Sequence, residues 1–428
     1  MLKRRRKVKK KRNNIKLYIP LMILSFLLIV SAVFYFQVID REEPNKSKLS
    51  STTKKKVSNE DVQDKADDES SVKIRIAAAG DIMFHDDQLA SAYDEVTDTY
   101  DFTPMFQDVR DVFQNADFAI ANFETTTAGS EQPFVGYPRF NSPDEAVDAI
   151  INAHIDAVTT ANNHSLDTGK DGLLRTVRLL REKQLPSVGT YDDQSGSRIL
   201  MKNVNGIDIA VIAYTESTNG LGKEYPEDQL NDMLNLMTKE NIKRDIEEAK
   251  KQDADLIIAF MHWGEEYSQE PNVTQIDFAN YLVEEGVDII LGSHPHVIQR
   301  SDFIEKDDNK AFVIYSLGNF ISNQRKETLG DEFESTEDGV IVNFTVEKNL
   351  TTGETYIVDV DYIPTWVYRK KRSQDDLYDY RILPIEQFIE DYNIPEDFKK
   401  RMQRSQEATM EKMDTVNVED VFGGFRDY

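Results

Sequence analysis

The chain of 428 residues contains no cysteine. This absence excludes disulfide bonds, thiolate zinc sites, iron–sulfur ligation, a cysteine nucleophile and a lipid anchor attached through cysteine. Basic residues are concentrated at the amino terminus, where residues 1–16 carry ten Lys and Arg and no acid. The other 412 residues carry 41 basic against 77 acidic side chains, a net charge of −36. Because phosphate binding needs basic surface, this acidity excludes nucleic acid as the main partner.

One long hydrophobic run follows the basic segment. Residues 17–39 carry no charge, and as a helix they would be about 34 Å long, enough to cross a hydrocarbon core of about 30 Å. The run predicts a single-pass membrane protein with its amino terminus in the cytoplasm and its carboxyl-terminal part outside the cell. The alternative is a cleaved signal peptide, whose apolar region should be shorter and should end at small residues.

Composition divides the remaining chain into three parts. Residues 40–72 are rich in Lys, Glu, Asp and Ser and contain no aromatic residue, which predicts a flexible linker. Residues 73–368 alternate short apolar runs with helical patterns, which predicts an α/β domain. Residues 369–428 are charged and helical in pattern, and we expect an extension that packs on the outside of the domain or stays mobile.

The predicted strands are short, and most are predominantly apolar, as strands covered on both faces tend to be. The clearest helix has Leu173, Val177 and Leu180 on one face and Arg175 and Arg178 on the other. The predicted strands are 73–78, 118–122, 157–161, 207–214, 256–261, 287–291, 312–316 and 340–346, and the predicted helices are 172–184, 242–251, 275–285, 384–392 and 395–412.

Side chains of metal-binding types follow these strands. Ligands of α/β sheets bind beyond the carboxyl ends of the strands, so we expect these side chains to meet at one rim. Asp, Glu, Asn and His form a mixed oxygen and nitrogen set, which suits Mn²⁺, Fe or Zn²⁺ better than Ca²⁺ or Mg²⁺. Two such ions could polarise a phosphoryl or acyl oxygen and activate a water. The side chains are those of Asp81, Glu124, Asn163, His164, His262, His294 and His296.

Each of these residues also has a structural interpretation. A lone His at a strand end is more often structural than a ligand; His154 fits that interpretation, and His85 is ambiguous. Asp81 by itself could cap a helix. The His-Pro-His run at 294–296 has little structural use after an apolar strand and a glycine, so it favours a metal site.

Six motifs occur in order between residues 73 and 325. They are Gly80-Asp81-Ile82-Met83, Asn122-Phe123-Glu124, Ala161-Asn162-Asn163-His164, His262-Trp263-Gly264-x-Glu266-Tyr267, His294-Pro295-His296-Val297 and Ser316-Leu317-Gly318-Asn319-Phe320. Together they resemble the CapA family of capsule synthesis, the PgsA-type component of poly-γ-glutamate synthesis, and the membrane anchor before them also fits. That family is similar in turn to calcineurin-like metallophosphoesterases. The resemblance therefore implies a four-layer α/β/β/α sandwich, preceded by one transmembrane helix, with a two-metal centre.

The resemblance also implies roles, position by position. His164 would donate a proton to the leaving oxygen, a task suited to a group that titrates near neutral pH. Met83 stands where the superfamily has a ligand His, and its thioether is a poor ligand for a hard cation, so water or His85 would have to complete that metal's coordination. The implied cofactors are two divalent metal ions, held by Asp81, Glu124, Asn163, His262, His294 and His296.

Three further residues are candidates for substrate binding. Arg139 could hold a carboxylate or phosphate through two hydrogen bonds, or it could form an ordinary surface ion pair. Glu266 and Tyr267 follow the His262 motif and could contact either the substrate or the metal ligands.

These observations support three hypotheses. The first is a membrane-anchored extracellular protein that assists synthesis or export of the poly-γ-glutamate capsule polymer, with a membrane-bound amide ligase and a small integral membrane protein as partners. The second is an extracellular metallophosphoesterase unrelated to capsule. The third is a non-catalytic scaffold of a membrane synthase complex, which Met83 favours over the second.

Overall fold

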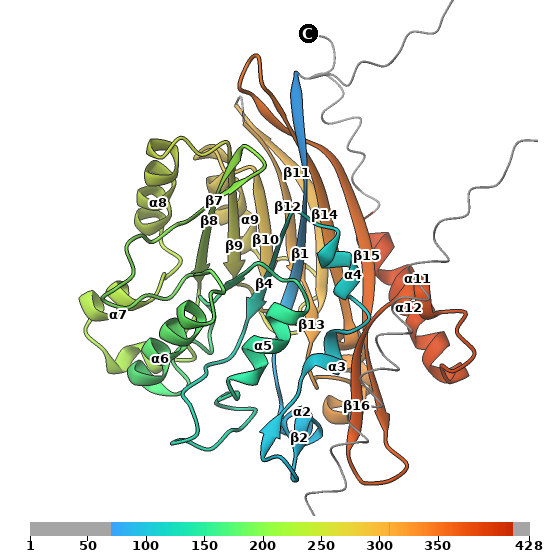
Figure 1. Ribbon diagram of the computed structural model, residues 1–428. Coiled ribbons are helices and arrows are strands. Elements are labelled where there is room, and N and C mark those ends of the chain that lie inside the picture. Colours follow the sequence, from blue (N-terminus) through green and yellow to red (C-terminus); the bar gives the residue numbers. More distant parts are fainter. Residues whose placement is uncertain (1–69, 308, 414–428) are drawn as a thin grey trace, which may run out of the picture. The chain divides into compact units, whose positions relative to one another are not determined.

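A computed structural model describes residues 70–307 and 309–413, and these residues form the mixed α/β domain that the sequence predicts (Figure 1). The predicted segments 1–16 and 17–39, and residues 40–69 of the predicted linker, lie outside the described residues. Within the described part of the chain, no helix is both long enough and apolar enough to span a membrane.

One sheet has eight strands and joins a parallel half to an antiparallel half. β1, β4, β5 and β6 pair in parallel, whereas β14, β15 and β16 continue the sheet on the other side of β1 in antiparallel pairs. In sheet order the strands are β16 (Tyr378–Pro384), β15 (Thr355–Lys371), β14 (Asp338–Asn349), β1 (Ser71–Ile82), β4 (Phe118–Phe123), β5 (Ala157–Thr159) and β6 (Ser187–Val188), and β13 (Asn319–Ile321) pairs with the end of β1.

The second sheet has six strands with a parallel centre and one antiparallel strand at each edge. In sheet order they are β11 (Ile298–Lys306), β12 (Asn309–Leu317), β10 (Ile289–Ser293), β9 (Leu256–His262), β8 (Ile207–Thr215) and β7 (Leu200–Val204). A separate small hairpin joins β2 (Tyr93–Asp94) to β3 (Thr99–Tyr100).

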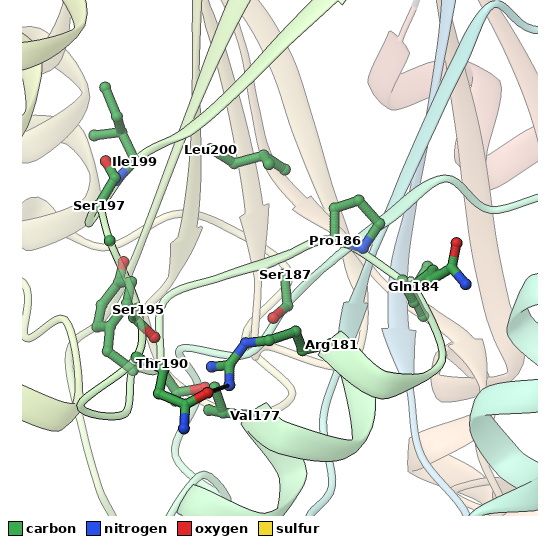
Figure 2. Close-up of a pocket in the computed structure, with 14 residues that line it drawn as sticks. Val177, Arg181, Gln184, Pro186, Ser187, Thr190, Ser195, Ser197, Ile199 and Leu200 are labelled. Atoms are coloured by element: carbon green, nitrogen blue, oxygen red, sulfur yellow. Dashed lines mark hydrogen bonds between the residues drawn. The ribbon is translucent and has the colours of Figure 1, made fainter.

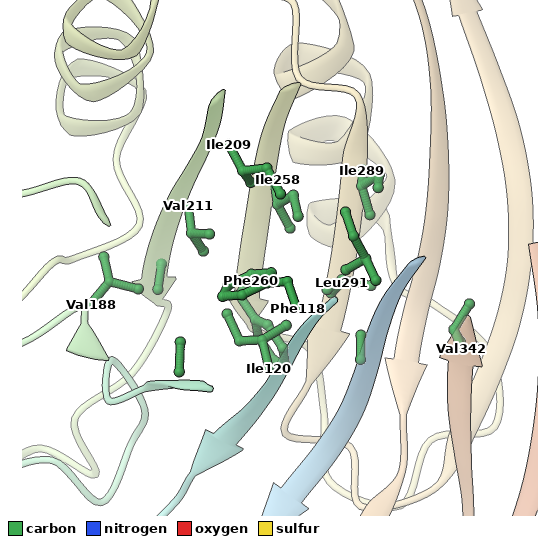
Figure 3. Close-up of a cluster of buried hydrophobic side chains, with 14 of the residues drawn as sticks. Phe118, Ile120, Val188, Ile209, Val211, Ile258, Phe260, Ile289, Leu291 and Val342 are labelled. Atoms are coloured by element: carbon green, nitrogen blue, oxygen red, sulfur yellow. The ribbon is translucent and has the colours of Figure 1, made fainter. Parts of the chain in front are cut away.

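The two sheets share an apolar core. Phe118 and Ile120 of β4 lie in this core with Ile258 and Phe260 of β9 (Figure 3). Each sheet also buries its other face under helices, which explains why the parallel strands are apolar on both sides.

Helices cover the outer faces of both sheets (Figure 1). Behind the eight-stranded sheet lie α2 (Asp86–Ala92), α3 (Thr103–Phe106), α4 (Arg110–Gln114) and α5 (Glu145–Asn152), and behind the six-stranded sheet lie α8 (Lys239–Lys251) and α9 (Val273–Glu284). The other helices are α6 (Gly169–Glu182), α7 (Glu227–Met233), α10 (Lys326–Leu329), α11 (Ile385–Phe388) and α12 (Glu396–Met413), with 3-10 turns η2 (Leu221–Glu224) and η3 (Asp331–Glu337).

All eight predicted strands are present, and α6, α8, α9 and α12 confirm four predicted helices. The prediction of a helix over 384–392 is wrong for most of its length, because α11 covers only Ile385–Phe388. The stretch after residue 368 is also not helical from its start: β15 runs through that expected domain boundary to Lys371, and β16 returns beside it. Tyr380 and Ile382 alternate into the core from β16, a period-two pattern that charged neighbours hide in the sequence.

Candidate metal centre

Asp81 lies at the end of β1, where backbone segments approach closely. Gly80 makes this approach possible, because a Cβ atom there would lie 2.0 Å from the carbonyl oxygen of Gly318. The Asp81 N–H donates to that same oxygen at 3.1 Å, and Asp81 pairs with Asn319 of β13. The glycines therefore bring the motifs at the ends of β1 and β12 into direct contact.

The buried Asp81 carboxylate is surrounded by hydrogen-bond donors. Asn122 Nδ2 donates to Oδ1 at 2.7 Å, and the His294 N–H donates to Oδ2 at 3.2 Å. His296 Nδ1 lies 3.3 Å from the same Oδ2. Burial raises the pKa of Asp81, but the hydrogen bonds and the attraction of His296 outweigh it, so the pKa falls below its ordinary value.

Glu124 follows β4 and is fully buried. Asn122 Nδ2 lies 3.3 Å from Oε2. Oε1 has no hydrogen-bond partner among the described residues, and it lies 3.4 Å from His262 Nε2 and 3.9 Å from His296 Nε2. Burial, and then the neighbouring charge of Asp81, raise the pKa of Glu124 well above its ordinary value. An unpartnered buried carboxylate oxygen facing two imidazole nitrogens is a fit for a cation.

His262 and His294 complete the cluster. His262 Nε2 lies 3.1 Å from Asn163 Oδ1, which brings the predicted ligand Asn163 to the same place. The rings of His262 and His294 lie 4.8 Å apart, and His294 Nδ1 has no hydrogen-bond partner in the described part of the chain. Burial, reinforced by His296, lowers the pKa of His294 to about 3, and burial followed by the neighbouring imidazoles lowers the pKa of His262 well below its ordinary value. Both rings are thus neutral near pH 7, as metal ligands must be.

Two overlapping groups of side chains place ligand atoms within 4.8 Å of one another. One group is Glu124, His294 and His296, and the other is Asp81, Glu124 and His262. Glu124 belongs to both, so its carboxylate occupies the position that a ligand shared between two ions would take. The two groups together hold five side chains, and Asn163, beside His262, is the sixth predicted ligand in the cluster.

Met83 and His85 lie beside this cluster but do not extend it. The Met83 side chain is buried, and its N–H donates to the carbonyl oxygen of Ile321 at 2.9 Å. Within the described residues, His85 belongs to neither group of candidate ligands, and its Nδ1 lies 3.3 Å from the backbone nitrogen of Asn323, which donates to it. The expectation that His85 could replace the missing histidine is therefore not supported by its position.

His164 is held in one orientation from two sides. Its Nδ1 lies 2.7 Å from Asp167 Oδ2, and the same oxygen accepts a 2.6 Å hydrogen bond from the Phe140 N–H. The Phe140 ring meets the His164 ring edge to face, with centroids 4.8 Å apart. Because Nδ1 is engaged by a carboxylate, Nε2 is the nitrogen left for proton transfer.

Of the predicted substrate residues, Arg139 and Glu266 are exposed, whereas Tyr267 is half-buried. Arg139 is exposed and adjoins Phe140, and it forms no ion pair with any described residue, so the surface ion pair that we considered is not observed. Glu266 is exposed, and it adds to burial in raising the pKa of Tyr267. The Tyr267 N–H donates to the Pro295 carbonyl at 2.7 Å, and its ring lies 6.2 Å from the His296 ring.

Sequence reasoning missed the residues that orient the candidate ligands and His164. Asn122, Asp167, Ser293 and Asn319 each contact one or more of them and are all buried. The available signal was their position, since each of them lies within or beside a strand-end motif. Residue type alone does not separate an orienting Asn or Ser from a turn residue.

A separate cavity of about 400 Å³ lies beside β6 and β7 (Figure 2). Its lining includes Arg181, Thr190 and Ser195, together with the apolar Val177 and Ile199. None of the predicted site residues lines it, so it does not alter the assignment of the candidate centre.

Comparison with known proteins agrees with the motifs. The chain is 26% identical over 345 residues to "Capsule biosynthesis protein CapA" of Bacillus anthracis, which covers 77% of this chain and 81% of that protein. It is 28% identical over 286 residues to "PGA biosynthesis protein CapA" of Bacillus subtilis (strain 168), covering 66% and 70% respectively. Among solved structures, the calcineurin-like phosphoesterase YfkN of Bacillus subtilis matches with a TM-score of 0.40 and 15% identity, over 80% of this chain and 98% of that one. The family model described as bacterial capsule synthesis protein PGA_cap matches residues 75–324, more than half of the chain, and the chain therefore belongs to that family.

Proposed function

We propose that this protein assists the synthesis or export of a poly-γ-glutamate capsule polymer, through a metal-binding domain of the metallophosphoesterase type held outside the cell by the segment 17–39. Family membership supports the capsule role. The observation that carries the metal site is Glu124 Oε1, a buried carboxylate oxygen that lacks a hydrogen bond within the described residues and faces the Nε2 atoms of His262 and His296.

The residues fit a divalent cation on electrostatic grounds. Burying the carboxylates of Asp81 and Glu124 side by side is costly unless positive charge lies near both. No Lys or Arg forms an ion pair with either carboxylate in the described part of the chain, and the nearby rings of His262 and His294 are neutral. The attraction of His296 lowers the pKa of Asp81, but the pKa of Glu124 stays raised. A bound cation would supply the missing charge.

The donor set favours Mn²⁺, Fe or Zn²⁺, since it mixes imidazole nitrogens with carboxylate and amide oxygens. When bound, such an ion would act as a Lewis acid and activate water. One ion would have a poorer ligand set than the other, because Met83 replaces a histidine and His85 is turned to the backbone of Asn323. The proposed ligands are Asp81, Glu124, Asn163, His262, His294 and His296.

The chain's own residues would bind the substrate and move the proton. His164, oriented by Asp167, would donate a proton to the leaving oxygen. Arg139 is exposed, adjoins Phe140 and has no acidic partner among the described residues, so its guanidinium is available for a carboxylate or phosphate of the substrate. Glu266 and Tyr267, beside His296, would contact the same substrate or fix the loop around it.

The proposed partners are a membrane-bound amide ligase and a small integral membrane protein of a polymer synthase. The acidic body of the protein would not attract a polyanion by itself. Divalent cations that bridge the protein and the polymer would overcome the repulsion between these two acidic partners. A brief contact while the polymer passes the protein would not require attraction.

Two other functions fit part of the same observations. An extracellular phosphoesterase unrelated to capsule would use the same cluster, and a non-catalytic scaffold would keep the fold without turnover. The scaffold is favoured by one observation, the buried Met83 at a position where the superfamily pattern has a ligand.

The test combines metal analysis with polymer output. Full-length protein purified in detergent should contain Mn, Fe or Zn, and Asp81→Ala and His296→Ala should lower both the metal content and the polymer released by cells. His154→Asn is the control, because His154 has φ 63°, a conformation that Asn tolerates, and lies outside both ligand groups. If the purified protein contained no metal and cells with either alanine variant released a normal amount of polymer, the result would favour the non-catalytic scaffold.

A further inference from the structure

Ser293 and His262 are partners across the parallel pair β9–β10. Both side chains are buried, and Ser293 Oγ lies 2.9 Å from His262 Nδ1. No other hydrogen bond of the Ser293 side chain is found in the described part of the chain. The hydroxyl is therefore committed to this ring nitrogen.

The second polar neighbour of His262 Nδ1 is a donor. Asn122 Nδ2 lies 3.4 Å from Nδ1, whereas Asn122 Oδ1 accepts from Thr159 Oγ1 at 3.2 Å and from Asn162 Nδ2 at 3.4 Å. Those two contacts fix which end of the Asn122 amide points at the histidine. Among the described residues, Ser293 Oγ is thus the one atom that can accept a hydrogen bond from an N–H at His262 Nδ1.

The opposite nitrogen of the ring faces the candidate centre. His262 Nε2 lies 3.1 Å from Asn163 Oδ1 and 3.4 Å from Glu124 Oε1. A hydrogen on Nε2 would be donated to these oxygens and would block ligation. A neutral imidazole carries only one N–H, so a lone pair on Nε2 requires the hydrogen on Nδ1.

We propose that Ser293 is a positioning residue: its hydroxyl accepts the Nδ1–H of His262 and thereby presents the Nε2 lone pair to the cation. This inference rests on the proposed metal site. The hydroxyl can rotate, so in the metal-free protein it can instead donate to Nδ1 while Nε2–H bonds to Asn163. Ser293 therefore allows both proton positions, and binding of a cation selects one of them.

His296 provides an internal comparison within the same protein. Its Nδ1 has two acceptors, Asn319 Oδ1 at 3.1 Å and Asp81 Oδ2 at 3.3 Å. Neither of them is Ser293. Removal of the Ser293 hydroxyl should therefore disturb His262 and leave the proton position of His296 unchanged.

The test uses full-length protein in detergent, Zn²⁺ and Mn²⁺ as the probes, and three variants. Ser293→Ala should weaken binding of the metal by about 10- to 100-fold, the usual effect of removing a hydrogen-bond partner of a ligating histidine. Ser293→Thr, which keeps the hydroxyl, should bind nearly as wild type. Ser405→Ala is the matched control, since Ser405 is a fully buried serine on α12, and its affinity should not change.

Nitrogen NMR of the zinc-loaded histidines gives a readout independent of activity. Zinc-loaded wild type should show His262 protonated at Nδ1. In zinc-saturated Ser293→Ala the Nδ1–H signal of His262 should be weakened or shifted. The Nδ1–H signal of His296 should be the same in both proteins. Equal metal affinity in wild type and Ser293→Ala, or a loss of the same size in Ser293→Thr, would overturn the inference. Failure of wild-type protein to bind either metal would instead overturn the proposed function on which it rests.

Discussion

Asn319 and Asp81 are direct neighbours across the parallel pair β1–β13, and one oxygen of each side chain flanks the same ring nitrogen, Nδ1 of His296. The Asn319 amide is fixed, because its Nδ2 donates to the Thr336 carbonyl at 2.9 Å and to Gln324 Oε1 at 3.0 Å. The neutral amide oxygen can therefore take the His296 N–H and leave the Asp81 carboxylate for a cation.

This relationship predicts different effects for two substitutions of Asn319. Asn319→Leu should weaken divalent metal binding by about tenfold, since His296 would then hydrogen-bond to Asp81 alone. Asn319→Asp should retain binding, because a carboxylate oxygen still accepts the N–H. Competition with a chromophoric chelator measures the affinity.

Gln324→Leu is the control for that pair, since it removes a partner of the Asn319 NH₂ group and keeps the oxygen that faces His296. Equal losses of metal affinity in Asn319→Leu and Asn319→Asp would contradict this prediction. They would mean that metal binding depends on the hydrogen bonds that Asn319 Nδ2 donates and not on the one that Asn319 Oδ1 accepts from His296.

A second prediction concerns the buried acid Glu124. Burial and Asp81 raise the pKa of Glu124, so its ionised form destabilises the metal-free fold. Glu124→Gln should therefore increase the free energy of unfolding in EDTA by about 1–2 kcal/mol and abolish the stabilisation that Mn²⁺ gives to wild type. Urea unfolding with and without metal measures both effects.

The matched control is Glu131→Gln, which removes the same charge at an exposed position and should change neither value. If Glu124→Gln destabilised the metal-free protein, a protein cation or a strong hydrogen bond would have to compensate Glu124, contrary to the unpartnered Oε1.

A third prediction concerns pH and a carboxyl group remote from the centre. Burial raises the pKa of Asp288 from 3.8 to about 7, against the hydrogen bond that its Oδ2 accepts from the Ile257 N–H. Between about pH 4 and pH 7 the folded state binds more protons here than the unfolded state, so this group's contribution to stability falls as pH rises. Asp288→Asn should therefore be more stable than wild type at pH 8, and the difference should disappear near pH 4.

The expected gain at pH 8 is about 2 kcal/mol, since solvent screens the partly exposed carboxyl and Asn keeps an acceptor for Ile257. Urea unfolding at pH 4, 6 and 8 measures it. A stability difference that does not vary with pH would contradict the assignment to Asp288.

A fourth prediction concerns the attachment of α12. Arg401 forms an ion pair with Glu337, a fully buried carboxylate that also accepts a 3.1 Å hydrogen bond from Trp366 Nε1. Arg401→Ala should destabilise the protein by about 3 kcal/mol, because it leaves that buried charge with the more distant Arg325, 3.8 Å away. Thermal and urea unfolding report the loss.

Lys400→Ala, the neighbouring substitution, should have little effect, because no ion pair of Lys400 occurs in the described part of the chain and Lys400 lies on the outer surface of α12. The double variant Arg401→Ala, Glu337→Gln should recover much of the stability lost in Arg401→Ala. Absence of such recovery would assign the effect to the other contacts of Arg401, its packing on Trp366 and its ion pair with Glu327.

Much of the architecture was predictable because it depends on local patterns. The run 256–261 is apolar throughout, and in 207–214 Asp208 is the one charged residue, so both runs identify buried strands without knowledge of their neighbours. β16 was missed because its inward Tyr380 and Ile382 alternate with charged residues in a short segment. Its strand character depends on pairing with β15, which a local pattern does not contain.

The sequence by itself determined which side chains are available and, through the rule that strand ends meet at one rim, that Asp81, Glu124 and the later histidines would lie together. Only the tertiary structure decided how they meet: that Glu124 Oε1 lacks a hydrogen bond among the described residues, and that Ser293 and Asn319 each hold one ring nitrogen. The physical reason is the distance along the chain over which each interaction acts. Strand formation follows from neighbouring residues, whereas hydrogen-bond partners depend on distances of a few ångströms between segments brought together by two sheets and a shared core.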